Sequence, residues 1–481
     1  MKNILFAASE SVPFIKTGGL ADVVGSLPKN LDKELFDARV IMPKYTCIPE
    51  KFRNEMTYIG SFYMEFNRRN RYVGVMSLVY EGITYYFVDN EEYFGGSYPY
   101  GDMLWDIEKF GFFSKAVLSV LPMIDFRPDI IHCHDWHSSL VPVYLKTLFA
   151  ANEYYRGIKA IMTIHNLKFQ GTWDIGTVRA ITGLPDELFT PDKLECFKDA
   201  NCLKGGIVYS DAVTTVSETY VEETKTPFYG ERLDSLLWAR RDAYYGIVNG
   251  IDYDSFNPKT DKAVPHNYGT EDFAEKKRLN KLELQKQLGL READNMMLIG
   301  IVSRLTDQKG FDLIGRVFEE LIQDNIQFVI LGTGEWKYEE MFRYFAGKYP
   351  DKVSANTLYS DELARRIYAA SDAFLMPSLF EPCGLSQLIS LRYGTLPIVR
   401  ETGGLKDTVK AYNEFENSGT GFSFANYNAH EMMATVRYAE NIYYGHYERW
   451  NQMVKRALEQ DFSWKNSAIK YEKLYMQLLE G

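Results

Sequence analysis

The sequence lacks any uncharged apolar run of about 18 residues, the length that a helix needs to cross a bilayer. We therefore expect no membrane span and no membrane partner. Cysteine is also scarce, because only five occur and no two of them have the Cys-x-x-Cys spacing. This odd, scattered set argues against a disulfide framework or a zinc cage and favours a reducing compartment. The apolar stretch at the N-terminus is too short for a signal peptide, so we expect a cytoplasmic protein.

Positive charge is in deficit. The chain has 54 Lys and Arg against 65 Asp and Glu, which gives a formal net charge of −11 at pH 7. Affinity for nucleic acid comes largely from basic side chains on phosphates, so this balance argues against a nucleic-acid partner. An anionic small ligand would need a local basic cluster. With 481 residues and 46% hydrophobic content, the chain is too long for one ordinary core, and we expect two globular domains.

Two consecutive strand-turn-helix units stand out in the second half of the chain. The apolar runs 373–376 and 396–399 are each followed by a glycine turn, Glu381 to Gly384 and Thr402 to Gly404, and then by a helix-like segment. Either turn alone is more simply interpreted as a tight connection. Their succession favours a ligand site, because ligands of open parallel sheets lie outside the carboxyl ends of the strands. Backbone N–H groups at such helix starts can face an anion.

The Thr-Gly-Gly-Leu sequence that begins at Thr402 also occurs after the first predicted strand, residues 3–8. Here Lys16 and Thr17 precede Gly18, Gly19 and Leu20, and Asp22 follows in the predicted helix. A Gly-Gly turn entering a helix is an anion-binding arrangement, and Lys16 adds a mobile positive charge. The glycine spacing matches neither the dinucleotide fingerprint nor the P-loop, which argues against a nicotinamide enzyme or a phosphate-loop ATPase.

Histidines gather at two further strand ends. The strand-like segment 127–133 runs into His134, Asp135 and His137, and the strand 159–164 ends at His165 and Asn166. The cluster invites a metal, but we expect at least one of His132 and His134 to point away, because they alternate along a strand end. No second ligand cluster is visible, so a metal site is disfavoured.

A basic pair follows the predicted strand 297–302. Arg304 and Lys309 lie five positions apart in one loop, beside Gly310. Together they could neutralise a diphosphate without magnesium, since Arg offers a planar fork and Lys a compact charge. The alternative of two solvated surface charges is equally weighted at this point. The aromatic, glycine-rich segment 93–100 fits either a loop over a cleft or a simply exposed loop, and both remain open.

The strand and helix alternation occurs twice, on either side of a polar segment, 259–280, that lacks strand signals. We therefore predict an α/β protein with two doubly wound, Rossmann-like domains facing a central cleft. Their predicted limits are 1–248 and 249–455. An amphipathic helix that begins near a Ser463 cap ends the chain and would cover a hydrophobic face.

Seven motifs together resemble bacterial glycogen synthases, the relatives of plant starch synthase. They run in the expected order over nearly the whole chain: Lys16-Thr-Gly-Gly-Leu-Ala-Asp-Val, His134-Asp-Trp-His-Ser-Ser, Thr163-Ile-His-Asn-Leu, Val248-Asn-Gly-Ile-Asp, Ser303-Arg-Leu-Thr-Asp-Gln-Lys-Gly, Phe380-Glu-Pro-Cys-Gly-Leu-Ser-Gln-Leu and Thr402-Gly-Gly-Leu-Lys-Asp. The resemblance implies the GT-B fold and transfer of glucose from ADP-glucose to the 4-hydroxyl at the non-reducing end of an α-1,4-glucan, with retention of configuration. It implies no cofactor and no metal. It also implies that the segment 456–481 is a helix that crosses back to the first domain.

The resemblance also implies roles for individual residues. Arg304 and Lys309 would hold the diphosphate, Tyr359 would lie against the adenine, and His165 would lie beside the anomeric carbon. The remaining contacts to glucose, phosphate and acceptor would come from Lys16, Gly18, Gly19, Asp22, Asp135, Asn166, Asn249, Glu381, Cys383, Gly384, Leu385, Thr402, Gly403 and Gly404. Of these, the resemblance counts Asp135 and Glu381 with His165, Arg304 and Lys309 as catalytic.

Two departures and two alternatives accompany this interpretation. Ser386 stands where the family pattern leads us to expect Thr, an exchange that keeps the hydroxyl, and the segment 259–280 carries no family motif. One alternative is another retaining GT-B glycosyltransferase that uses UDP-glucose and a small acceptor. The other is a catalytically silent glucan-binding or nucleotide-sensing protein on the same scaffold. Oligomeric state and allosteric control leave no signal in the sequence.

Overall fold

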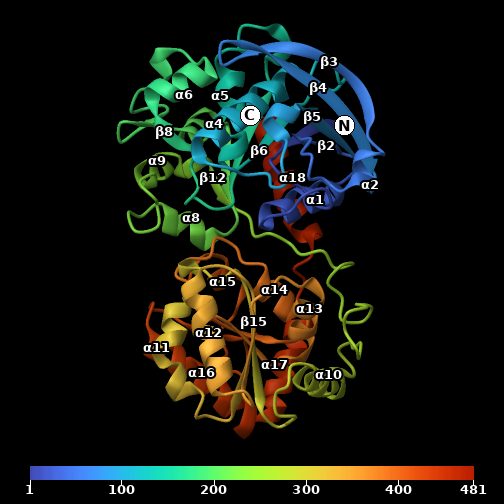
Figure 1. Ribbon diagram of the computed structural model, residues 1–481, viewed down its shortest axis with the longest axis vertical. Helices are drawn as coiled ribbons and strands as arrows, with labels where there is room; N and C mark the ends of the chain where they lie inside the picture. Colours follow the sequence, from blue (N-terminus) through green and yellow to red (C-terminus); the bar gives the residue numbers. More distant parts are fainter. Residues whose placement is uncertain (481) are drawn as a thin grey trace. The chain divides into compact units, whose positions relative to one another are not determined.

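A computed structural model describes residues 1–480, which divide into two compact units (Figure 1). Unit 1 comprises Met1–Val216, Val221–Gly250 and the C-terminal helix α18 (Trp464–Glu480), and unit 2 comprises Ser217–Tyr220 and Ile251–Ser463. No helix within residues 1–480 is long and apolar enough to cross a membrane.

Unit 1 is built on a nine-stranded sheet with the order β12-β11-β7-β6-β1-β2-β5-β4-β3. The strands from β12 to β5 run parallel, whereas β4 pairs antiparallel with β5 and with the edge strand β3. A small antiparallel sheet, β8-β10-β9, lies apart from it. The strands are β1 (Lys2–Ala7), β2 (Phe36–Pro43), β3 (Thr57–Phe66), β4 (Arg69–Tyr80), β5 (Ile83–Asp89), β6 (Ile130–His134), β7 (Lys159–Ile164), β8 (Thr172–Asp174), β9 (Glu195–Cys196), β10 (Asp199–Asn201), β11 (Ala212–Thr215) and β12 (Tyr244–Gly246).

The central strands of unit 1 are apolar without alternation, because helices cover both faces of a parallel sheet. Residues 4–7 of β1 and 130–134 of β6 are all buried. The helices of this unit are α1 (Gly19–Asn30), α2 (Glu50–Arg53), α3 (Glu91–Phe94), α4 (Met103–Ser119), α5 (Leu140–Lys146), α6 (Ile175–Thr182), α7 (Cys202–Tyr209), α8 (Glu218–Thr224), whose first turn is grouped with unit 2, α9 (Asp234–Ala239) and α18.

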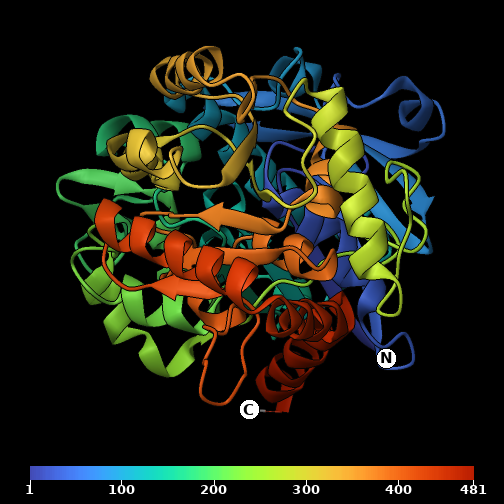
Figure 2. The ribbon, with the colours of Figure 1, turned by 90° about the horizontal axis from the view of Figure 1, so that it is seen from below.

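The last helix, α18, packs on the beginning of the chain. It contacts α1, and the Glu472 carboxylate accepts a hydrogen bond of 2.7 Å from the Asp32 backbone N–H. Its buried Tyr475 ring meets Phe36 of β2 edge to face, with the ring centroids 5.8 Å apart. Both ends of the chain therefore belong to unit 1 (Figure 2).

Unit 2 contains a six-stranded sheet that is parallel throughout, in the order β15-β14-β13-β16-β17-β18. Its strands are β13 (Met297–Val302), β14 (Ile326–Leu331), β15 (Val353–Asn356), β16 (Ala373–Met376), β17 (Leu396–Arg400) and β18 (Phe422–Phe424). Its helices are α10 (Phe273–Gln287), α11 (Phe311–Leu321), α12 (Trp336–Lys348), α13 (Asp361–Ala370), α14 (Ser386–Arg392), α15 (Gly403–Thr408), α16 (Ala429–Gly445) and α17 (Tyr447–Glu459).

Side chains of the strands in unit 2 alternate between two cores. Ile299 and Phe328 pack with the cluster under α11, α12 and α16, whereas Leu298 and Val329 pack with the smaller cluster under α10 and α13. The helices accordingly lie in two layers, one on each side of the sheet (Figures 1 and 2). This arrangement confirms the predicted doubly wound α/β class.

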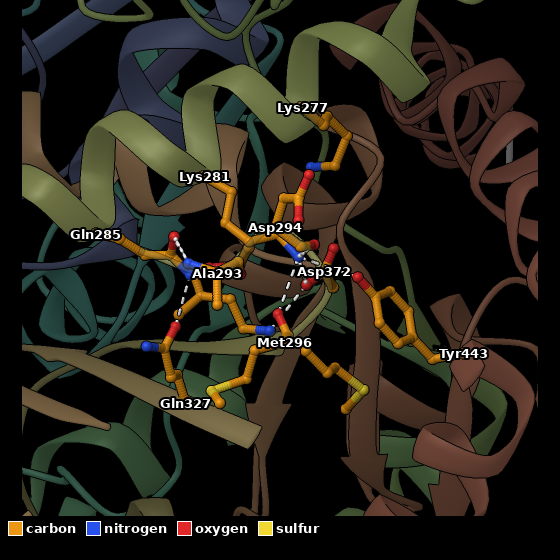
Figure 3. A network of polar contacts seen from close by, with 12 residues as sticks. Lys277, Lys281, Gln285, Ala293, Asp294, Met296, Gln327, Asp372 and Tyr443 are labelled. Carbon is orange, nitrogen blue, oxygen red and sulfur yellow. Dashed lines mark hydrogen bonds and ion pairs between the residues drawn. The ribbon is translucent and has the colours of Figure 1, made fainter. Parts of the chain in front are cut away.

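Two buried lysines of α10 tie together the edge of this sheet at which the strands begin (Figure 3). Lys281 donates to the backbone oxygens of Asp294 and Met296, each at 3.0 Å, and pairs with the Asp372 carboxylate at 2.6 Å. Lys277 donates to the backbone oxygen of Ala369 at 3.0 Å. These ammonium groups satisfy acceptors that parallel strands leave open at their starts. The loops that follow the strands lie at the opposite edge.

Candidate active site

The candidate residues of unit 2 come together because β13, β16 and β17 are neighbours in the sheet. Parallel neighbours end at one edge, so the loops that follow them lie side by side. The backbone joins them, since the Leu379 N–H donates to the Gln308 oxygen at 2.9 Å and the Gly404 N–H donates to the Glu381 oxygen at 3.0 Å. Both predicted glycine turns and the predicted basic loop thus belong to one surface.

Lys309 and Glu381 form the charged centre of this surface. The Lys309 ammonium lies 2.6 Å from Glu381 Oε2, and the two side chains are 16% and 7% exposed. The Ser378 hydroxyl also donates to Glu381 Oε2, at 3.1 Å. The carboxylate therefore fixes the direction of the ammonium group. A fixed cation of this kind can stabilise a developing negative charge without reorganisation.

Arg304 and Tyr359 differ from that pair, because both are exposed. The Arg304 guanidinium has no partner within residues 1–480, and Tyr359 is 84% exposed after β15. The structure places both residues in loops after strands of the same sheet but does not bring them into contact with Lys309. They are groups that a ligand could engage from outside.

The second glycine turn follows closely on the first. Gly403 has a φ of +44°, and a Cβ there would stand 2.0 Å from the Glu381 oxygen, while one on Gly404 would stand 2.0 Å from the Cys383 oxygen. Glycine is required at both positions because any side chain would separate the turns. Thr402 precedes α15 and Leu385 precedes α14, so each turn opens a helix as predicted.

The side-chain amide of Gln387 holds the backbone of both Cys383 and Gly384. Gln387 Nε2 donates to the backbone oxygens of both residues, each at 2.9 Å, and Gly384 has a φ of +75°. Cys383 is buried. The backbone of the first turn therefore has a single, supported conformation.

In unit 1, the predicted anion-binding loop leads from β1 into α1. Gly18 is the N-cap and Gly19 the first residue of α1, and no side chain caps this helix start. The half-exposed Lys16 ammonium pairs with Asp22 Oδ1 at 2.8 Å. The lysine is thus anchored on the first turn of the helix that it precedes.

Glu10 and Tyr100 belong to the same loop, although the sequence did not identify either as a site residue. The Glu10 carboxylate accepts the Thr17 backbone N–H and, at 2.8 Å each, the Thr17 and Tyr100 hydroxyls. Burial raises the pKa of Glu10, and the hydrogen bond from the Thr17 backbone opposes this rise. The position of Glu10 after a strand could have identified it. Nothing local could have identified Tyr100, which is 90 residues away.

The two ends of the segment 93–100 are packed, whereas residues 95–98 are exposed. The half-buried Tyr100 ring is stacked on His137 with the centroids 4.9 Å apart, and its hydroxyl reaches Glu10. The end of this segment is therefore packed against the strand ends of unit 1 and is not simply exposed. Trp136, which packs on His137, completes the aromatic group.

Asp135 holds the backbone of the His165 turn. It adopts a φ of +55°, unusual for a residue other than glycine, and its Oδ1 accepts the His165 N–H at 2.7 Å. Burial raises the pKa of Asp135 to about 7, and the hydrogen bond from His165 opposes this rise. Such strain persists only where the surroundings enforce it and is frequent at functional sites. Asn166 lies next in this turn, where its side-chain oxygen accepts the Lys168 N–H at 3.1 Å.

The prediction that His132 or His134 points away from the other is wrong. Their rings stack with the centroids 4.3 Å apart, because residues two positions apart on a strand share a face. His134 Nδ1 lies 2.9 Å from Nε2 of His165, which follows the adjacent strand β7. No group of three or more His, Cys, Asp and Glu side chains that could hold a metal occurs within residues 1–480.

Asn249 lies at the end of unit 1, after β12. It is buried, and its side-chain oxygen has no hydrogen-bond partner in the described part of the chain. A buried amide oxygen without a partner is costly and is often reserved for a ligand.

Comparison with known proteins places this geometry in a family. Residues 3–239 match the family model described as starch synthase catalytic domain, and residues 280–459 match the model described as glycosyl transferases group 1. A glycogen synthase from Lachnospira eligens is 63% identical over 99% of this chain and 100% of its own length. One from Lachnoclostridium phytofermentans is 59% identical with the same coverage.

A solved structure agrees. The catalytic domain of starch synthase IV from Arabidopsis thaliana, bound to ADP and acarbose, superposes with a TM-score of 0.91 at 33% identity, covering 100% of this chain and 99% of that one. Full-length identity at this level, together with the GT-B fold, supports an active glucosyltransferase over the catalytically silent alternative. The chain belongs to the glycogen synthase family of GT-B glucosyltransferases.

Proposed function

We propose that the chain transfers glucose from ADP-glucose to the 4-hydroxyl at the non-reducing end of an α-1,4-glucan, with retention of the α configuration and without a metal. The observation that carries this proposal is the ion pair between Lys309 and Glu381, which joins the first glycine turn to the loop that also carries the exposed Arg304. The names of the relatives support glycogen as the acceptor, and the plant structure with bound ADP supports an adenine nucleotide.

Unit 2 would hold the donor. When the bond between the sugar C1 and the diphosphate breaks, negative charge develops on the departing ADP and positive charge on the sugar ring. Lys309 and Arg304 would stabilise the first charge, which removes the need for a divalent cation. The backbone around Glu381, Cys383, Gly384 and Leu385, with that of Thr402, Gly403 and Gly404, would bind the glucose hydroxyls and phosphate oxygens. Tyr359 would lie against the adenine.

Unit 1 would supply the groups around the anomeric carbon and the acceptor. The turn at His165 and Asn166, held by Asp135, would lie beside the transferred sugar, and the backbone carbonyl of His165 would face the positive charge. The helix start at Gly18 and Gly19, with Lys16 anchored on Asp22, would reach the distal phosphate. The buried Asn249 oxygen would accept from a sugar hydroxyl. The acceptor hydroxyl forms the new bond to C1, and its proton goes to a phosphate oxygen of the released ADP.

Donor competition tests the nucleotide. We expect ADP-glucose to be used in preference to UDP-glucose when both are supplied at equal concentration with glycogen. The anomeric configuration of the new linkage, followed by proton NMR at early times, should be α. A preference for UDP-glucose with a small acceptor would overturn the donor assignment, and a β linkage would overturn retention.

A further inference from the structure

Three imidazoles form a column inside unit 1. His132 and His134 of β6 stack with the ring centroids 4.3 Å apart, and the ring of His165, after β7, meets that of His134 edge to edge with the centroids 5.3 Å apart. His132 and His134 are fully buried, whereas His165, at the site end of the column, is only partly so. The proposed function gives His165 a place beside the sugar but gives no task to the ring behind it.

The hydrogen bonds of the column differ from ring to ring. Both nitrogens of His132 have partners, since Nδ1 lies 2.8 Å from the Tyr475 hydroxyl and Nε2 lies 2.5 Å from the Thr163 hydroxyl. His134 Nδ1 lies 2.9 Å from His165 Nε2. His134 Nε2 is buried and has no partner within residues 1–480. Among residues 1–480, the ring of His134 therefore has a polar contact only with His165.

Burial favours the neutral form of all three rings. Burial lowers the pKa of His132 and of His165 to about 3 and lowers the pKa of His134 well below its ordinary value. A neutral imidazole carries one N–H and one lone pair, so the contact between His134 and His165 joins one donor to one acceptor.

The unpartnered Nε2 of His134 indicates which of the two rings donates the hydrogen bond between His134 and His165. If His165 were the donor, His134 would carry its proton on Nε2, where a buried N–H would have no acceptor. If His134 donates from Nδ1, its Nε2 is a bare lone pair. Buried N–H groups without partners are rarer than buried acceptors without partners, so the second arrangement is favoured. His165 must then carry its proton on Nδ1.

We propose that His134 is a positioning residue for glucosyl transfer: it fixes the ring of His165 in the Nδ1–H tautomer, which offers a hydrogen-bond donor to a hydroxyl oxygen of the transferred sugar. This role rests on the proposed function, which places His165 beside that sugar. A ring without this constraint could rotate or change tautomer, and it would then present a lone pair where the sugar oxygen needs a donor.

The tautomer can be measured without any substrate. In full-length protein labelled with ¹⁵N-histidine, long-range proton–nitrogen spectra distinguish the two neutral tautomers, and a His165→Asn variant identifies the His165 signals. We expect Nδ1 of His165 to carry the proton in the unaltered chain. Finding the proton on Nε2 would overturn the proposal. This readout does not depend on turnover, so it remains decisive even if the donor or acceptor proves to be different.

Two substitutions at one position separate positioning from packing. His134→Phe keeps the stacked ring but removes the Nδ1–H, and we expect loss of the fixed tautomer with kcat lowered by about 10-fold to 100-fold, as for other small displacements of a catalytic group. His134→Asn gives up the ring but places an amide N–H near the same point. We expect it to restore most of kcat relative to His134→Phe.

Tyr475→Phe is the matched control, since it removes a hydrogen bond from the far end of the column and leaves the contact between His134 and His165 intact. We expect its kcat and its His165 tautomer to be unchanged. Full turnover in His134→Phe, or equal losses in His134→Phe and His134→Asn, would overturn the positioning role. Failure of the unaltered chain to transfer glucose would instead contradict the proposed function alone.

Discussion

Asp135 shows how one residue can be costly for the fold and useful for the site. The residue is half-buried, its backbone is strained, and its carboxylate accepts a hydrogen bond from the N–H of His165. A residue without this burial and strain would make the folded chain more stable, but it would not hold the His165 turn through this hydrogen bond. Such conflicts between stability and geometry are typical of positions retained for function.

The Asp135 carboxylate leads to a pH-dependent stability. Because the pKa of Asp135 is raised to about 7 in the folded chain, the folded state binds more protons than the unfolded state between about pH 4 and pH 7. Its contribution to stability is therefore present below about pH 4 and is lost as the pH rises through 7. We expect Asp135→Asn to gain stability over the unaltered chain across this range, by up to about 4 kcal/mol, and to lose activity.

Urea denaturation at several pH values, followed by circular dichroism, measures this difference. The gap between the two proteins should widen from pH 4 to pH 7 and then level off. A gap that is constant with pH would show that Asp135 does not titrate in this range.

Lys309 should matter for turnover far more than for folding. We expect Lys309→Ala to lower kcat by about 100-fold or more, because a preorganised charge on the leaving group is lost, while the melting temperature changes little. Lys348→Ala is the control, since Lys348 forms an equally short ion pair of 2.6 Å with Glu319 but is exposed at the far end of α12. Near-normal turnover in Lys309→Ala would refute the diphosphate role.

At the scale of elements, α10 acts as a clamp on the starting edge of the sheet in unit 2. Lys277 donates to the Ala369 and Tyr393 backbone oxygens and to the Thr395 hydroxyl, at 3.0, 3.1 and 2.8 Å. These acceptors precede β16 and β17 in the chain. Holding the starts of the strands in register also fixes where their ends, and the glycine turns beyond them, are placed.

The clamp has its own dependence on pH. Burial lowers the pKa of Lys277 to about 7, so the unfolded state binds more protons than the folded state between about pH 7 and pH 10. The stability of the unaltered chain relative to Lys277→Met should therefore rise over this range, by up to about 5 kcal/mol. Urea midpoints from pH 6 to pH 10 would reveal the trend. A flat difference for Lys277→Met would exclude the assignment.

The regular elements were largely predictable, for a physical reason. The strands β7, β13 and β16 were predicted with the bounds that they have, because strands of a buried parallel sheet are continuous apolar runs closed by glycine or polar turns. The edge strand β3 was missed, since it is half exposed and lacks such a run. The small sheet of β8, β9 and β10 was missed because its strands are only two or three residues long.

The site was predictable only where it is local in sequence. The glycine turns and the loop with Lys309 were identified from their motifs, yet the ion pair between Lys309 and Glu381 joins residues 72 positions apart. The same holds for Tyr100 on Glu10 and for the ring of His134 on that of His165. Contacts of this kind depend on strand order, which the sequence pattern does not specify.

The whole molecule has a net charge of −11, although the proposed donor is itself an anion. The chain as a whole repels ADP-glucose, so binding has to come from local groups such as Arg304, Lys309 and Lys16. In the proposed function, these fixed cations would do the work of a divalent metal.

If fixed cations replace a metal, the activity should be insensitive to chelators. We expect the rate of glucose transfer to be the same in excess EDTA and in added magnesium, because no step is assigned to a metal. The measurement is the initial rate of ADP release with glycogen at fixed ionic strength. A rate that falls in EDTA and returns with magnesium would contradict the role assigned to the lysines and arginine.

The most direct test of the account is to measure ADP release from ADP-glucose with and without glycogen, together with glucose incorporation into polymer in the same reaction. The account predicts that release requires glycogen and equals incorporation mole for mole. Release without incorporation, or no release at all, would contradict it.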